Sequence, residues 1–116
     1  MEQRENTEAH RKGCAPYETE AGGSFETLLI SLWARATETK RTDAIIKDHQ
    51  AVSMMEQIEY DFTKFEKTWL SQVGVAIRTE LLDTAVTNFI GKYPDAVIIN
   101  LGCGLDTRFF RIIMGR

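Results

Sequence analysis

The sequence predicts an α/β chain that is mostly helical, with one strand and one glycine turn near its end. Three observations predict this class. Apolar residues recur at helical spacing from Phe25 onward, a β-branched run follows at Val97–Ile99, and Gly102 and Gly104 come shortly after that run. Uninterrupted apolar strands are typical of parallel sheets that helices cover on both faces.

The first segment, residues 1–23, is polar, shows no hydrophobic periodicity and ends in two glycines. Such a segment cannot bury enough apolar surface to offset the entropy lost when it is ordered. We therefore expect a mobile tail before the first helix.

The second segment, residues 24–67, is predicted to be helical. Its first helix carries one apolar stripe, formed by Phe25, Leu28, Leu29, Leu32, Trp33 and Ala36. Ser24 is a suitable N-cap for this helix, and Asp48 is a suitable N-cap for a second one. Residues 61–67 are expected to form a loop.

The third segment, residues 68–116, is predicted to hold a long helix, a strand and the glycine turn. The helix runs from about Trp69 to Lys92 and ends before Pro94, because the residue preceding a proline is pushed out of helical space. Its expected buried side consists of Leu70, Val73, Ile77, Leu81, Ala85 and Phe89. Ala96–Leu101 is the predicted strand.

The glycine turn, residues 102–104, follows the strand at the place where ligands bind in open α/β sheets. Glycine permits unusual backbone angles and lets a ligand approach the main chain closely. The spacing resembles the dinucleotide fingerprint G-x-G-x-x-G, but Thr107 occupies the third glycine position, which disfavours an NAD site. Asp106 and Thr107 are suitable caps for a following helix. An ordinary glycine turn without a ligand is the structural alternative.

Three stretches carry a resemblance to a known family. "VIINLGCGLDTRFFR", "SQVGVAIRTELLD" and "TLLISLWARATETKRTDAIIKD" closely resemble the leucine carboxyl methyltransferase family, whose bacterial members include O-methyltransferases of polyketide biosynthesis. The resemblance covers Phe25 to Arg116. It implies a class I S-adenosylmethionine (SAM)-dependent methyltransferase, in which residues 24–67 form a helical lid. Residues 68–116 then form the long helix, first strand and SAM-binding turn of an incomplete Rossmann-like domain.

The same resemblance implies a set of cofactor-binding residues. Arg78 matches the family's arginine for the SAM carboxylate, which a guanidinium can hold through two parallel hydrogen bonds. The other expected SAM contacts lie in or beside the glycine turn, at Asn100, Gly102, Cys103, Gly104 and Asp106.

Some of these residues keep an alternative interpretation. Arg78 can instead be a surface arginine that pairs with Asp83 or Glu80. Arg35 and Lys40 lie where the family places a basic residue facing the cofactor, but surface solvation is the favoured interpretation for both.

Composition excludes several other classes of function. The net charge is −3 and no apolar run is long enough to span a bilayer, so neither nucleic acid nor a membrane is an expected partner. The 2 cysteines, Cys14 and Cys103, lie far apart and predict neither a disulfide framework nor a metal site. Together with a polar start that does not resemble a signal peptide, this predicts a cytoplasmic protein.

The expected reaction is O-methylation of a carboxyl or hydroxyl group on a small molecule or a protein. No catalytic residue is identified, because the 2 histidines and the carboxylates form no acid–base pattern. The chain is expected to be the N-terminal part of such an enzyme, inactive alone, and its unpaired strand is expected to pair with a second copy. The alternatives are a non-catalytic helical interaction module and a truncated gene product that has lost activity.

Overall fold

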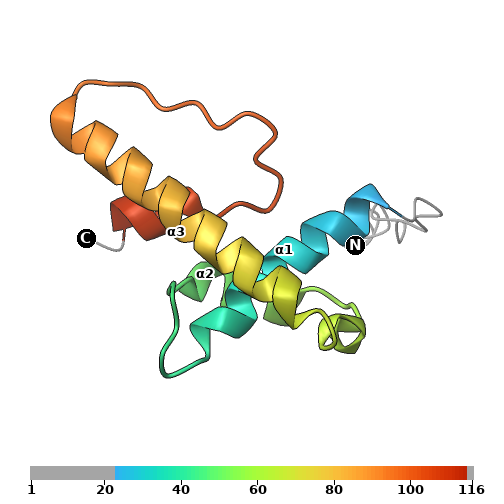
Figure 1. The fold of residues 1–116 in the computed structure, drawn as a ribbon. Helices are drawn as coiled ribbons and strands as arrows, with labels where there is room; N and C mark the ends of the chain where they lie inside the picture. Colours follow the sequence, from blue (N-terminus) through green and yellow to red (C-terminus); the bar gives the residue numbers. More distant parts are fainter. Residues whose placement is uncertain (1–22, 115–116) are drawn as a thin grey trace, which may run out of the picture.

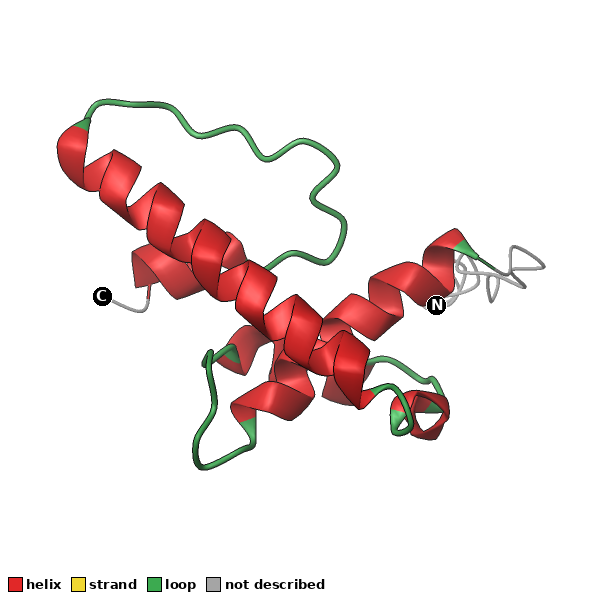
Figure 2. Ribbon diagram, viewed as in Figure 1, coloured by secondary structure: helices red, strands yellow, loops and turns green. Residues whose placement is uncertain are grey.

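The computed structural model describes residues 23–114, which are mostly helical and contain no strand (Figures 1 and 2). The elements in chain order are α1 (Ser24–Thr39), α2 (His49–Gln57), the 3₁₀ helix η1 (Phe62–Phe65), α3 (Trp69–Lys92) and the π-helical η2 (Phe110–Met114). In Figure 1, α3 crosses α1, and both α2 and α3 pack against α1. The predicted tail lies outside the described residues except for Gly23. No helix in residues 23–114 is both long and apolar enough to cross a membrane.

Helix α1 is the central helix. Its buried residues include Leu29, Leu32, Trp33, Ala34 and Ala36. This face is wider than the predicted stripe, because α1 has α2 on one side and α3 on another. The predicted cap at Ser24 is wrong: Gly23 holds the N-cap position, and Ser24 is the first helical residue.

The prediction for α2 is confirmed at its start. The carboxylate of Asp48 accepts a hydrogen bond from the backbone N–H of Ala51 at 2.9 Å, which satisfies one of the free donors of the first turn. The loop expected at 61–67 instead contains η1, because Phe65 is buried with its ring 5.9 Å from that of Trp33. This aromatic contact draws the segment onto α1.

Helix α3 has the predicted bounds but not the predicted buried face. Its buried residues are Ala76 and Thr79. Because these side chains are small, α3 can approach α1 closely. Much of the expected buried side is exposed, namely Leu70, Ile77, Leu81 and Phe89. The prediction was wrong because it rested on the spacing of apolar residues alone, and these side chains have no packing partner that buries them among the described residues.

The predicted strand at Ala96–Leu101 is not formed. These residues belong to the long loop that leaves the end of α3 and returns to η2 (Figure 2). Val97 is 83% exposed and Ile99 is 75% exposed. A strand needs a neighbour to pair its backbone groups, and no described segment lies beside this one in a ladder.

Candidate functional site

The glycine turn adopts backbone angles that favour glycine. Gly102 has φ 61° and Gly104 has φ 50°, both in the left-handed region. The N–H of Asp106 donates to the carbonyl of Cys103 at 2.8 Å and closes a turn. A Cβ on Gly104 would lie 2.7 Å from Cδ2 of Leu28, whereas the space beside Gly102 is open. The turn therefore packs on α1 at one glycine and leaves the main chain accessible at the other.

A hollow of about 180 Å³ lies between the glycine turn, α1 and α3. Arg78 and Cys103 line it, together with Asp106, so the fold gathers three of the predicted site residues around one space. The remaining lining residues are Leu28, Ser31, Arg35, Val75, Thr79, Leu82, Leu105 and Arg108. The volume is below the roughly 300–1,000 Å³ of typical small-molecule pockets, so this hollow can enclose part of a ligand.

Arg78 is exposed and forms no ion pair with the residues that the structure describes. The alternative partners are engaged elsewhere. Asp83 pairs with Arg108 and Arg111, and the carboxylate of Glu80 accepts from the hydroxyl of Thr84. The guanidinium of Arg78 is thus a cation at the rim of the hollow with no carboxylate partner in residues 23–114.

Asp106 is tied to its neighbours by several polar contacts. Its Oδ2 accepts from the amide of Asn100 at 2.8 Å, and its Oδ1 accepts from the N–H of Arg108 at 3.1 Å. The second contact satisfies the N–H of Arg108, the first helical residue after the turn, in keeping with the predicted capping role of Asp106. Burial raises the pKa of Asp106, but the Asn100 amide and the charges of Arg108 and Arg111 outweigh burial, so the pKa is lowered. Asp106 therefore stays ionised beside the hollow.

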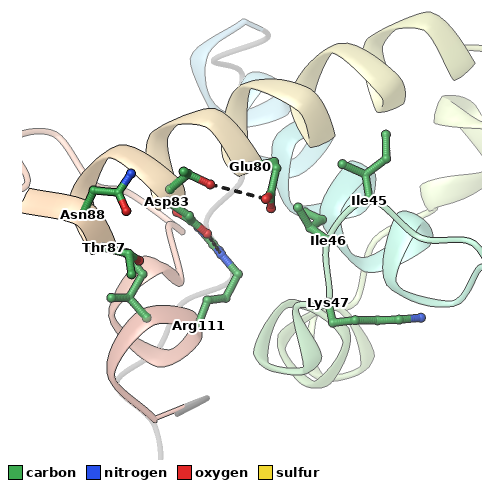
Figure 3. A pocket seen from close by; sticks show the side chains of 10 residues that line it. Ile45, Ile46, Lys47, Glu80, Asp83, Thr87, Asn88 and Arg111 are labelled. Atoms are coloured by element: carbon green, nitrogen blue, oxygen red, sulfur yellow. Dashed lines mark hydrogen bonds and ion pairs between the residues drawn. The ribbon is translucent and has the colours of Figure 1, made fainter. Parts of the chain in front are cut away.

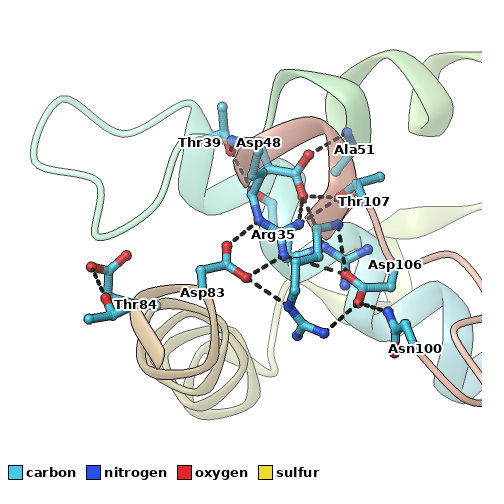
Figure 4. Close-up of polar contacts among 12 residues, drawn as sticks. Arg35, Thr39, Asp48, Ala51, Asp83, Thr84, Asn100, Asp106 and Thr107 are labelled. Atoms are coloured by element: carbon cyan, nitrogen blue, oxygen red, sulfur yellow. Dashed lines mark hydrogen bonds and ion pairs between the residues drawn. The ribbon is translucent and has the colours of Figure 1, made fainter. Parts of the chain in front are cut away.

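Asp48 is the centre of a buried polar cluster (Figure 4). Besides the N–H of Ala51, its carboxylate accepts from Arg35 Nε at 3.1 Å, Arg111 Nη1 at 2.8 Å and the hydroxyl of Thr107. Thr107 was predicted to cap the next helix, but its buried hydroxyl donates to Asp48 instead. One carboxylate thus joins α1, α2 and the segment that follows the glycine turn.

Arg35 is buried, so the interpretation of this residue as a surface cation is wrong. Burial lowers the pKa of Arg35, and the nearby charge of Asp48 opposes that effect. Besides its bond to Asp48, Arg35 donates from Nη2 to the carbonyl of Leu105 at 2.6 Å. Lys40 is exposed, as expected. Arg35 therefore connects the buried face of α1 to the backbone just after the glycine turn.

A second ion cluster centres on Asp83 of α3. Its carboxylate accepts from Arg111 at 2.6 and 3.1 Å and from Arg108 Nε at 2.9 Å. Burial lowers the pKa of Arg111, but hydrogen bonds and charge from Asp83 and Asp48 outweigh burial and raise it. Asp83 and Arg111 also line a separate hollow of about 370 Å³ whose lining is both polar and apolar, and the side chain of Lys47 points away from it (Figure 3).

The partners in these two clusters were not predicted from the sequence. Asp48 was assigned only a capping role, and Arg111 no role at all. One signal was available: Arg111 stands alone within an apolar run from Phe109 to Ile113. A charged residue in such a run is buried only when it is paired, which indicates a buried carboxylate elsewhere. The identity of that carboxylate depends on tertiary contacts between residues 63 positions apart.

Comparison with known proteins identifies the class of protein to which this chain is similar. The sequence model described as "Leucine carboxyl methyltransferase" matches residues 29–114. The chain is 36% identical over 90 residues to tetracenomycin polyketide synthesis O-methyltransferase TcmP of Streptomyces glaucescens. It is 32% identical over 98 residues to the S-adenosyl-L-methionine-dependent methyltransferase dpfgK of Gibberella zeae. No solved structure gives a significant match.

This chain belongs to the leucine carboxyl methyltransferase family, as the resemblance implied. Each match covers 78% of the chain and 33% of the relative, so the chain spans about a third of the length of the curated relatives it matches.

Proposed function

We propose that this chain supplies the methyl-donor site of an SAM-dependent O-methyltransferase. The observation that carries the proposal is the hollow that brings Arg78 of α3 together with Cys103 and Asp106. Cys103 lies between the two glycines that resemble the family's SAM turn, although the glycines themselves do not line the hollow. Family membership supports this function, and it disfavours a non-catalytic helical interaction module.

The residues around the hollow fit the chemistry of SAM. The ligand carries a carboxylate, for which Arg78 is a cation without a partner among the described residues. The main chain at Gly102 is open to close approach. The carboxylate of Asp106 lines the hollow while pairing with Arg108 at 3.1 Å and Arg111 at 3.4 Å. Because the hollow holds only about 180 Å³, we propose that it receives the methionine part of the ligand.

When bound, SAM supplies an activated methyl group on a sulfonium, and an acceptor oxygen takes that methyl group. Methylation of a carboxylate needs little proton transfer, since the acceptor is already anionic, so alignment and exclusion of water dominate. We propose a carboxyl or hydroxyl acceptor, in keeping with the name of the Streptomyces relative. Turnover is proposed to need an acceptor pocket beyond the small hollow described here.

Calorimetric titration of the chain with SAM tests the donor site. We expect wild-type binding and a loss of about ten- to a hundredfold in affinity for Arg78→Ala, since a hydrogen bond to a charged group contributes about 1.5–3 kcal/mol. Arg78→Lys is expected to fall between the two, because lysine keeps the charge but not the bidentate geometry.

Lys92→Ala is the matched control, since Lys92 is an exposed cation on the same helix that does not line the hollow. It is expected to bind SAM as wild type does. Equal losses in Arg78→Ala and Lys92→Ala would indicate nonspecific charge attraction and would contradict the proposed role of Arg78.

A further inference from the structure

We infer that Asp48 is a positioning residue that couples α1 and α2 to the glycine turn, so that the donor site is held in shape from the helical side. The inference rests on the proposed function for its link to SAM. The coupling itself rests on contacts that the structure gives directly.

Two routes connect Asp48 to the turn. In the first, Arg35 donates to the Asp48 carboxylate at 3.1 Å and to the Leu105 carbonyl at 2.6 Å, one residue beyond Gly104. In the second, the Thr107 hydroxyl donates to the same carboxylate. Leu105 also packs against two apolar clusters that α1 forms, one with Phe65 of η1 and the other with Ala51 of α2. The backbone that closes the turn is therefore held at Leu105 and at Thr107.

The buried charges make this connection costly to break. Arg35 and Arg111 both donate to one oxygen of Asp48, and the Asp48 side chain is fully buried. A displaced carboxylate would leave two arginines without this partner in a region from which water is excluded, which is costly. Asp48 also caps α2 through Ala51. A shift of α2 therefore cannot occur without moving the groups that hold the turn.

Thr107 and Thr39 form a matched pair for testing this coupling. Both are buried, and both have a hydroxyl that contacts Asp48. Thr39 accepts from the backbone N–H of Asp48 and donates to the carbonyl of Arg35, so its contacts stay between α1 and the start of α2. Only Thr107 belongs to the segment after the glycine turn.

The experiment compares Thr107→Val with Thr39→Val in the full chain, by amide hydrogen exchange and by SAM titration. We expect Thr107→Val to speed exchange at the Asp106 amide, which closes the turn, by at least about tenfold and to weaken SAM binding. Thr39→Val is expected to leave this amide within about threefold of wild type. Thr107→Ser, which keeps the hydroxyl, is expected to restore protection.

Equal exchange at Asp106 in the two valine variants would overturn the inference, because Thr107 would then act only as a buried hydroxyl. If Thr107→Val does not fold, Arg35→Lys replaces it in the experiment. Lysine keeps the positive charge but lacks the planar guanidinium that donates to both Asp48 and Leu105. Exchange at the Asp106 amide that is unchanged in Arg35→Lys would then overturn the inference. If wild type binds no SAM, the proposed function fails, and the exchange data still decide the coupling.

Discussion

The interior around Asp48 and the outer face of α3 are opposites in composition. The first is rich in charged and polar groups, including Arg35, Glu38 and Thr39, yet it is buried, and no buried side-chain polar atom in residues 23–114 lacks a hydrogen-bond partner. The second, with the loop after it, is rich in apolar side chains such as Leu81 and Val97, yet it is exposed. From composition alone, the region around Asp48 would be predicted to be exposed and the outer face of α3 to be buried, which is the opposite of what the structure shows.

This contrast shows that neighbours decide what a residue contributes. Glu38 is buried because the Ile45 N–H, the Gln72 amide and Arg41 all donate to its carboxylate. Leu81 is exposed because no described element packs on its side of α3. We therefore expect the polar interior to govern the stability of this chain and the apolar face to contribute little.

The largest effect is expected from Asp48→Ala. Removing one partner from a buried ion pair costs about 3–5 kcal/mol, because the remaining charges stay buried without compensation. Urea unfolding of the chain measures this loss. Asp43→Ala is the control, since Asp43 is an exposed carboxylate paired with Arg41, and its unfolding midpoint should not change. If Asp48→Ala lowers the free energy of unfolding as little as Asp43→Ala does, the expectation that the polar interior governs stability is contradicted.

The next largest loss of stability is expected from one of two leucine-to-alanine substitutions. Leu32→Ala empties a fully buried position on α1 and is expected to lower the free energy of unfolding by about 2–5 kcal/mol. Leu81→Ala changes a side chain that is 66% exposed, so a change within about 0.5 kcal/mol is expected. Thermal unfolding followed by circular dichroism measures both. A large loss for Leu81→Ala would mean that the outer face of α3 is covered in solution.

A pair of glycines should give changes of opposite sign. Gly104→Ala forces alanine into the left-handed region and against Leu28, and the backbone cost alone is about 1–2 kcal/mol. Gly74→Ala lies within α3 with open space around it and should stabilise the chain by up to about 1 kcal/mol. Urea midpoints of the two variants measure the difference. Stabilisation by Gly104→Ala would show that the turn changes shape in solution.

The smallest effect is a pH dependence that comes from Asp106. Because its pKa is lowered in the folded chain, the stability that it contributes is complete above its unfolded pKa, about 3.9, and is lost as the pH falls through the lower folded value. The stability gap between wild type and Asp106→Asn should therefore narrow from pH 5 toward pH 3 in urea unfolding. A gap that is constant with pH would contradict the lowered pKa.

Much of the architecture followed from local pattern. The bounds of α3 agree with the prediction, because apolar spacing marks the helix and Pro94 ends it. The cap at Asp48 was also predicted, since a capping carboxylate needs only its own first turn. The strand at 96–101 was not formed, because an apolar run becomes a strand only when another backbone lies beside it.

The sequence by itself determined the family, the three α-helices of the described residues and the glycine turn, because each depends on residues close together along the chain. Only the tertiary structure decided that Arg35 is buried, that Asp48 holds Thr107 and Arg111, and that Arg78 shares a hollow with Cys103. The physical reason is that the energy of a charged group depends on its distance from other charges and from water. Segments that are distant in the sequence set those distances.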